Sequence, residues 1–457
     1  MMPVGTTLSR WTMSYFGAAL SYLLLAECLL AAGVWTPSLG IAEPGALAIV
    51  HAVTLGWLLL LMIGSLLQFA PVLTGNDRPA SRVDPIIFAG MVAGPALLML
   101  GFYLIGLGSS AAGPVMIAAT ATISVSIAAA SLSLSALLWR GRRVHAASLI
   151  VLVGIGCLLV TTAFGALFAL TISGQVEAPE IVAYGMEAVA FHASFGLGGW
   201  MTFAAIGVSY KLLPMFLLSD DMRKAQLIRR ASTLAVVFLS VAAIAAAVEP
   251  DFARVVFLSA AVLFALVVAA YLFEIYRTYR ARRRPALELN TVGSLPAFAM
   301  LGLSVSLLAL SLFLHAETHI MSAIVYLFVF GWLTGFGLAQ LLKIVPFLTW
   351  IEAFGPLLGR RPTPKLGELI NGRRAGVWLG LFYVSVVGAT ATLCLGSDMG
   401  FRMFAVLQTA STLALIIELV LARALANVEP EIKTAPFNKP ALFVAANHRG
   451  NANGSVP

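Results

Sequence analysis

Residues 51–74 read HAVTLGWLLLLMIGSLLQFAPVLT, and this stretch decides the class of the protein. It contains no Asp, Glu, Lys or Arg, and a helix of this length, at about 1.5 Å per residue, crosses the roughly 30 Å hydrocarbon core of a bilayer. The rest of the chain is similar, since 60% of its 457 residues are apolar and 11% are charged, against about 25% in soluble domains. The sequence therefore predicts an integral membrane protein and excludes a water-soluble globule.

Apolar runs of this kind recur along the whole chain. Bounded by polar or Gly/Pro-rich loops, they predict spans at about 12–35, 43–73, 85–108, 113–139, 146–173, 186–217, 231–248, 254–277, 294–314, 319–350, 375–395 and 402–424. The expected fold is an all-α polytopic membrane protein with about twelve transmembrane helices, forming a single transmembrane domain over 1–424. The tail, 425–457, is rich in Pro, Asn and Gly and is expected to be disordered.

Basic residues are segregated along the chain. All but two of the 28 Lys and Arg residues, Arg254 and Arg402, fall in the tail, near the N-terminus, or in and beside the loops after even-numbered spans. The positive-inside rule makes that side cytoplasmic, so both termini are expected inside a bacterial-type cytoplasmic (inner) membrane. Because these residues serve as topology signals within short loops, the net charge of +8 does not indicate a nucleic-acid partner. The expected environment is a lipid bilayer.

A Gly-Trp pair followed by a proline occurs three times. Trp57, Trp200 and Trp332 each follow a glycine, and a proline stands fourteen residues after each: Pro71, Pro214 and Pro346. Trp in an aromatic belt and Pro near a helix end would explain the residue types but not the fixed register. We interpret the pattern as an internal repeat of four spans, which predicts three pseudo-symmetric four-helix arcs at about 12–139, 146–277 and 294–424.

Two histidines lie inside predicted spans at the repeat positions. His51 stands six residues before its tryptophan and His192 stands eight before its own, a difference of about 200° around a helix, so the two could serve different sites. A neutral imidazole embedded in apolar side chains needs either a hydrogen-bond partner or a metal. Both are therefore candidate ligands of a metal or haem, with an internal hydrogen bond as the structural alternative.

Other polar residues lie near the same level. His315 and His319 are four residues apart at the start of the tenth span, where they could clamp a metal or simply face the interface. Glu27 and Glu187 could orient an imidazole, carry protons, or make an interhelical hydrogen bond. The three cysteines show no paired spacing, so neither a disulfide framework nor a zinc site is expected.

Residues 191–214 read FHASFGLGGWMTFAAIGVSYKLLP and resemble the haem-ligating tenth helix of haem-copper oxidase catalytic subunits, in particular the cbb-type, where a His-x-His pair precedes Gly-Trp. The segment 50–74 resembles the second helix of cbb-type oxidases and of the nitric oxide reductase large subunit, whose histidine ligates a haem. This resemblance implies that His51 and His192 bind a b-type haem. It also implies twelve spans, three arcs and ligands near the outer face.

The sequence departs from that family in three places. Ser194 replaces the second histidine of the pair, and the tenth span carries Ile324 and Tyr326 at the equivalent positions. Tyr326 therefore joins Glu27 and Glu187 as a candidate for proton handling or ligand positioning. The seventh span, 231–248, contains no histidine, so the copper-binding pair of the family is absent and copper is not expected in a complete site.

Two functions from different classes follow. One is a haem-binding membrane oxidoreductase that handles electrons, O2 or NO with an incomplete copper site, together with an electron-donor subunit or cytochrome. The other is a non-redox transporter or assembly factor for haem or copper that uses the histidines as a transient site. Bound haem in the purified protein would separate them.

Overall fold

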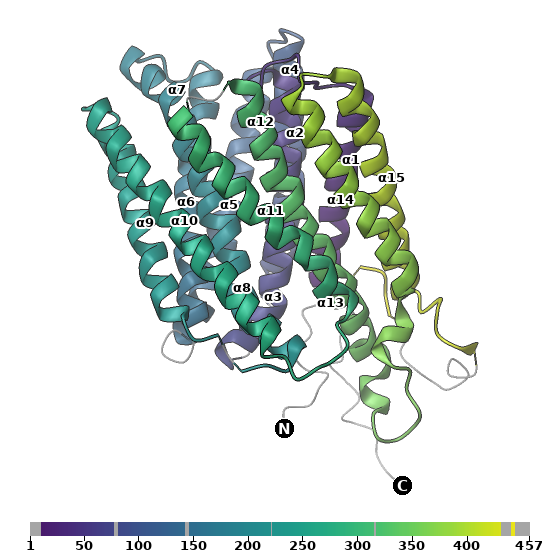
Figure 1. Cartoon of the computed structure of the whole chain (residues 1–457). Coiled ribbons are helices and arrows are strands. Elements are labelled where there is room, and N and C mark those ends of the chain that lie inside the picture. The colour runs from purple at the N-terminus through teal and green to yellow at the C-terminus, as the bar shows by residue number, and fades with distance from the viewer. Residues whose placement is uncertain are drawn as a thin grey trace.

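The computed structural model describes residues 11–76, 81–141, 146–220, 222–314, 317–430 and 440–443, and all regular structure in them is helical. Twelve helical stretches are long and apolar enough to cross a membrane, and they run roughly side by side (Figure 1). This confirms the predicted all-α polytopic class, in which each helix pairs its backbone polar groups internally, as the apolar bilayer requires.

Nine of the spans are single helices: α1 (Thr12–Ala32), α4 (Asp84–Gly106), α5 (Ala112–Gly141), α6 (Ala146–Ile172), α9 (Ala225–Ala245), α10 (Pro250–Arg280), α11 (Leu289–Leu314), α14 (Gly372–Cys394) and α15 (Asp398–Arg423). The other three are composite: α2 (Pro44–His51), η1 (Ala52–Leu59) and α3 (Leu60–Thr74); α7 (Pro179–Ala193), η2 (Ser194–Thr202) and α8 (Phe203–Leu217); α12 (Thr318–Tyr326), η3 (Leu327–Thr334) and α13 (Gly335–Phe354). Between α13 and α14 lie two short 3-10 turns, η4 (Gly355–Leu357) and η5 (Leu366–Leu369).

Several spans begin earlier than the apolar runs predict, and the difference is largest for α7 and α9. Helix α7 starts at Pro179 instead of about 186, and α9 starts at Ala225 instead of about 231. Proline is favoured in the first helical turn because its missing N–H needs no partner there, and this explains the start of α7. The first turns of both helices carry charged or polar residues, which a count of apolar residues assigns to loops.

The composite spans share one irregularity at the Gly-Trp pairs. In each, a π-helical segment of eight or nine residues (η1, η2, η3) contains the Gly-Trp pair, and an α-helix follows it. The glycines permit close approach: a Cβ built on Gly199 would lie 2.6 Å from the Cβ of Cys157, and one on Gly56 would lie 2.7 Å from the Cβ of Tyr22. The structure thus gives the three sequence repeats the same local conformation.

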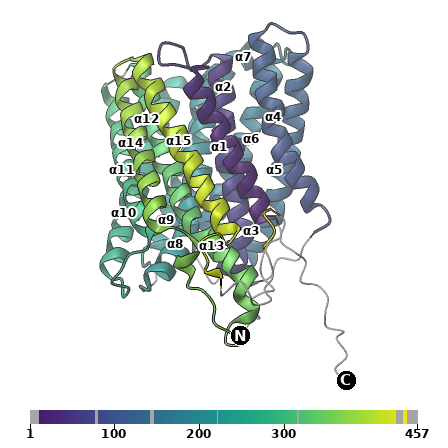
Figure 2. The same cartoon turned by 90° about the vertical axis from the view of Figure 1, so that its right-hand side faces the viewer.

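Helix contacts recur in the same order along the chain. The first helix of each four-span unit packs against the π-helical segment of that unit, and the last two helices of each unit form a hairpin: α4 with α5, α9 with α10 and α14 with α15. Helix α15 also packs against α1 (Figure 2). The composite spans all run in one direction, with α2, α7 and α12 at the upper end and α3, α8 and α13 at the lower end of Figure 1. Their grouping into three pseudo-symmetric arcs stays a prediction.

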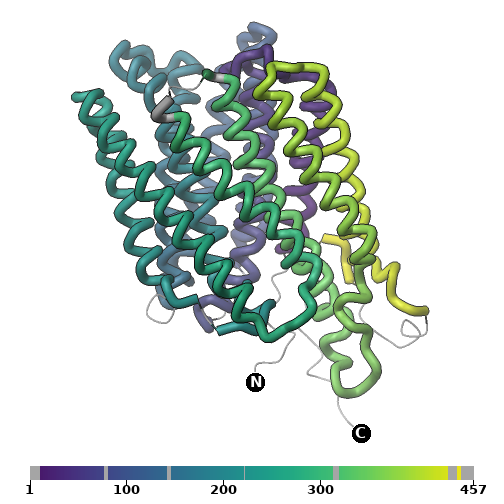
Figure 3. The backbone as a smooth tube through the Cα atoms, in the orientation of Figure 1, coloured from purple at the N-terminus to yellow at the C-terminus, as the bar shows by residue number. Residues whose placement is uncertain are grey.

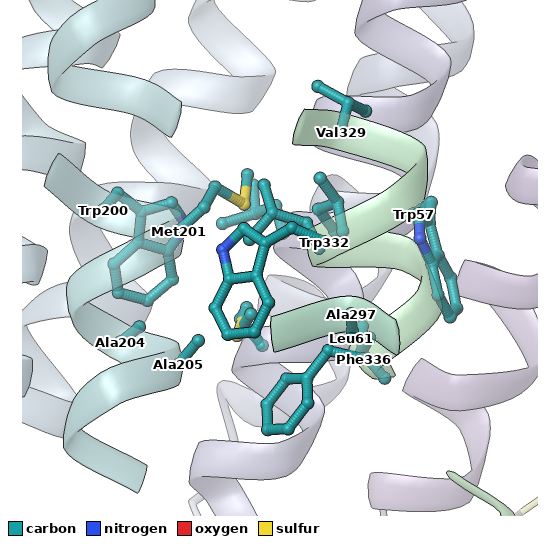
Figure 4. Packing of buried hydrophobic residues seen from close by; sticks show 14 of the residues in the cluster. Trp57, Leu61, Trp200, Met201, Ala204, Ala205, Ala297, Val329, Trp332 and Phe336 are labelled. Carbon is teal, nitrogen blue, oxygen red and sulfur yellow. The ribbon is translucent and has the colours of Figure 1, made fainter. Parts of the chain in front are cut away.

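The repeated tryptophans are buried in the core. Trp57, Trp200 and Trp332 are fully buried, and Figure 4 shows them around the packed interior of the bundle. The Trp57 indole donates a hydrogen bond to the Thr334 hydroxyl at 3.0 Å, which joins the first and third repeats. Trp332 stacks on Phe336 with ring centroids 5.0 Å apart. The motif seen in the sequence thus gives one direct contact between composite spans, from Trp57 in the first to Thr334 in the third.

The lower end of the bundle carries buried ion pairs. Arg423, the last residue of α15, lies 2.5 Å from a carboxylate oxygen of Glu352, and the side chains are 4% and 6% exposed. The segment with η4 and η5 hangs below this end in Figure 3. Within the predicted tail, Leu425 and Val428 are buried, and the Ala441 carbonyl accepts a hydrogen bond from Arg423 at 2.8 Å. Packing thus extends past residue 424, while 431–439 and 444–457 lie outside the described residues.

Candidate functional site

The structure brings His51 and His192 together. Their ring centroids are 6.5 Å apart and their planes are inclined by 37°. His51 is the last residue of α2, and His192 lies two residues before the second π-helical segment. The offset of two residues in the repeat register therefore does not place the two rings apart. The two histidines belong to one cluster and do not occupy separate places in the fold.

Backbone carbonyls orient both rings. Nδ1 of His51 lies 2.7 Å from the Leu47 carbonyl oxygen, one turn earlier in α2, and Nδ1 of His192 lies 3.1 Å from the Thr161 carbonyl oxygen in α6. A carbonyl only accepts, so in both rings Nδ1 carries the proton and donates it. A neutral ring then has its lone pair on Nε2, and no hydrogen bond from a described residue reaches either Nε2. This is the tautomer in which imidazole binds metals.

Aromatic and aliphatic side chains wall the pair. Phe102 of α4 lies 5.3 Å from His51 and Phe168 of α6 lies 5.3 Å from His192, both measured between ring centroids. A Cβ built on Gly165 would lie 3.4 Å from Cε1 of His192, so the absence of a side chain at Gly165 leaves room for the imidazole ring. Both histidines are partly buried as whole residues.

The spacing of the rings suits one metal ion between them. An ion bound at about 2 Å by one nitrogen of each ring separates the two centroids by roughly 6 Å, close to the observed 6.5 Å. No group of three or more His, Cys, Asp or Glu suitable for a metal occurs among the described residues. Among the described residues the pair therefore has no further ligand of these types to complete the four that a zinc ion needs.

A second polar cluster joins two other predicted residues, Glu27 and Tyr326. The Tyr326 hydroxyl donates to Oε1 of Gln408 at 2.7 Å, and Nε2 of Gln408 donates to Oε1 of Glu27 at 2.9 Å. All three side chains are buried, on α12, α15 and α1. Sequence reasoning missed Gln408. A signal existed, because an amide in the middle of an apolar span rarely lacks a polar partner.

The remaining candidates do not meet the histidine pair. Glu187 is exposed on α7, since five residues turn a helix by about 140° away from His192. Nδ1 of His319 lies 3.3 Å from a carboxylate oxygen of Glu317, an exposed residue at the start of α12. His315 lies outside the described residues, so the predicted clamp between it and His319 stays a prediction.

A small cavity lies away from the histidines, between α3, α8 and α13. Its volume is about 60 Å³, and its wall is mainly apolar. Two of the three polar residues that line it are paired elsewhere, since Ser209 bonds the Tyr271 hydroxyl at 2.7 Å and Gln340 donates to Ser294 at 2.8 Å. This volume holds a few small molecules but no haem, which needs several hundred Å³.

The chain matches no protein family model, and no curated protein sequence matches it significantly. A functional assignment therefore rests on the geometry of the site.

Proposed function

We propose that this protein is a haem-binding membrane redox protein in which His51 and His192 are the axial ligands of one b-type haem. The observation that carries the proposal is the meeting of two imidazoles from different repeats, each held at Nδ1 by a backbone carbonyl and each free at Nε2. A haem bound there would supply one-electron chemistry. With both axial positions taken by imidazole, electron transfer fits this arrangement better than reduction of O2 or NO.

The protein residues have definable roles in that function. Leu47 and Thr161 fix the tautomer and direction of the two rings through their carbonyl groups, as the outer hydrogen-bond partners of ligating histidines do in other metal sites. Phe102 and Phe168 supply apolar walls, which exclude water and tune the redox potential. No described residue provides the additional ligands of a copper centre beside this pair.

The position along the membrane normal suggests how electrons arrive. His51 is seven residues from the start of α2, or about 10 Å from that end of the span. Under the positive-inside rule this end faces outward, in a bacterial-type cytoplasmic membrane with both termini inside. An electron donor, either a partner subunit or a cytochrome, would then dock at the outer face.

A visible spectrum of the protein purified from haem-replete cells tests the proposal. We expect a Soret band with sharp reduced α-bands typical of two imidazole ligands, and little binding of carbon monoxide by the reduced protein. His51→Ala and His192→Ala should each convert the iron to a high-spin form that binds carbon monoxide. His319→Ala, which removes a histidine paired with Glu317 at the mouth of α12, is the matched control and should leave the spectrum unchanged.

The competing function is a non-redox transporter or assembly factor for haem or copper. Two observations favour it: both histidines are partly exposed, and among the described residues no third His, Cys, Asp or Glu joins them to form a metal-binding group. A colourless preparation from haem-replete cells that takes up haem or copper only transiently would support it. Unchanged low-spin spectra in both histidine variants would refute axial ligation by this pair.

A further inference from the structure

A single carboxyl group is buried at the upper end of α1. Glu27 is 1% exposed and lies five residues before the end of that helix, or about 8 Å along its axis. It therefore lies within the apolar thickness of the bundle and on the same half as His51. An ionisable side chain in this position is costly, so it is expected to serve a function.

The neighbours of Glu27 satisfy one of its oxygens only. Gln408 is oriented by Tyr326, which donates to its carbonyl oxygen, so that the amide N–H₂ of Gln408 faces Oε1 of Glu27. Oε2 of Glu27 is buried and has no hydrogen-bond partner among the described residues. The Thr412 hydroxyl, one helical turn after Gln408, is buried beside this carboxyl group and makes no hydrogen bond to any other described residue.

No described cation neutralises this carboxyl group. Arg402 of α15, a basic side chain near the end of α1, is exposed and donates to the carbonyl oxygens of Ala31 and Ala32 instead. An ionised carboxylate without a partner costs several kcal/mol in an apolar interior. A proton on Oε2 removes that charge and lets Oε2 donate a hydrogen bond to the adjacent Thr412 hydroxyl.

We propose that Glu27, Gln408, Thr412 and Tyr326 form an intramembrane proton-binding site, in which Oε2 of Glu27 carries the proton and donates it to the Thr412 hydroxyl. The Gln408 amide is a positioning group and does not relay protons, because it holds Oε1 and leaves Oε2 as the exchanging oxygen. Tyr326 positions the amide. The proposal is independent of haem binding.

The repeat register supports a site at this place. Tyr326 stands six residues before Trp332, as His51 stands six residues before Trp57. The same register position thus carries His51 in the first repeat, where the ring lies near His192, and Tyr326 in the third repeat, where the hydroxyl bonds Gln408 of α15. Two polar sites, one of imidazoles and one of a carboxyl group, occupy comparable places in the fold.

Infrared spectroscopy of the full-length protein in lipid vesicles at neutral pH tests the proposal directly. A protonated carboxyl group has a C=O stretching band separate from those of carboxylates and amides. We expect such a band, a downward shift of it in D2O, and its loss in Glu27→Gln. The matched control is Glu352→Gln, which changes a buried carboxylate paired with Arg423 and should keep the band.

A second variant keeps the test decisive if Glu27→Gln does not fold. Thr412→Val retains the carboxyl group and the side-chain shape but removes the acceptor, so the C=O band should move to higher frequency. Absence of the band, or a band indifferent to both changes, would overturn the proposal. Loss of the band on addition of Na⁺ at constant pH would also overturn it, in favour of a metal-cation site. None of these readouts depends on bound haem.

Discussion

Replacing Arg423 by Met should destabilise the protein more than any other single loss of charge in the described chain. Arg423 and Glu352 form an ion pair at 2.5 Å with side chains only 4% and 6% exposed. Removing the arginine leaves a buried carboxylate with no counter-charge, and such losses cost about 3–5 kcal/mol. The pair lies at the ends of α13 and α15, where water can approach after relaxation, so we expect the lower value, about 3 kcal/mol.

The hydrogen bonds of Arg423 add little to this value. The Thr349 hydroxyl, which receives one of them at 3.3 Å, keeps its own donation to the Val345 carbonyl. The Ala441 carbonyl is on an exposed segment and regains water. The double variant Arg423→Met plus Glu352→Gln removes both charges and should recover most of the loss, with a coupling of about 2 kcal/mol.

Reversible unfolding of the purified protein in one detergent, followed by tryptophan fluorescence, measures these free energies. Arg283→Met is the matched control. The side chains of Arg283 and Asp220 form an ion pair but are each about three-quarters exposed, so this pair should contribute nothing measurable to the free energy of unfolding. If Arg423→Met unfolds at the wild-type midpoint, or if the double variant is as unstable as the two single changes added together, the buried pair does not stabilise the fold in this way.

Three further predictions concern topology and packing. An alkaline-phosphatase fusion after Arg284 should be inactive, because the positive-inside rule puts that loop in the cytoplasm. Gly199→Ala should lower the free energy of unfolding by about 1–3 kcal/mol, because its Cβ would lie 2.6 Å from the Cβ of Cys157. Trp57→Phe should lower the free energy of unfolding by about 1 kcal/mol more than the smaller side chain alone would, because it removes the hydrogen bond to Thr334.

Each of these has an internal control. A phosphatase fusion in the loop 174–185 should be active, and an active fusion after Arg284 would reverse the proposed orientation. Gly380→Ala meets open space, so equal effects at the two glycines would contradict the close-packing argument. Trp200→Phe removes an indole whose N–H has no described partner, and it should therefore be less costly than the change at Trp57.

Much of the fold could be predicted because a membrane span is a local property of the sequence. Twelve apolar runs gave twelve helices, and errors were confined to ends such as Pro179, where charged residues lie inside the helix. The π-helical segments could not be predicted, because their hydrogen-bond shift depends on how Gly-Trp packs against neighbouring spans. The repeat marked the three Gly-Trp pairs but did not indicate the type of helix around them.

The candidate site was predictable residue by residue but not as an assembly. His51, His192, Glu27 and Tyr326 stood out because each is polar in an apolar run. Which of them meet depends on the direction of each side chain across several helices, and a repeat register with a two-residue offset suggested separate places for the histidines. Gln408 was overlooked because amides are less costly in spans than charges, although it is the residue that links two of the others.

The π-helical segment after His51 makes backbone conformation a determinant of which way that side chain faces. A π-helical turn holds one residue more than an α-helical turn, so rewinding 52–59 as regular α-helix without deleting a residue would turn His51 by about 100° relative to Trp57, while the span still crosses the bilayer. His51 would then no longer face His192, although neither histidine had been replaced. A substitution that favours regular α-helix in this segment is therefore enough to separate the two imidazoles with both histidines still present.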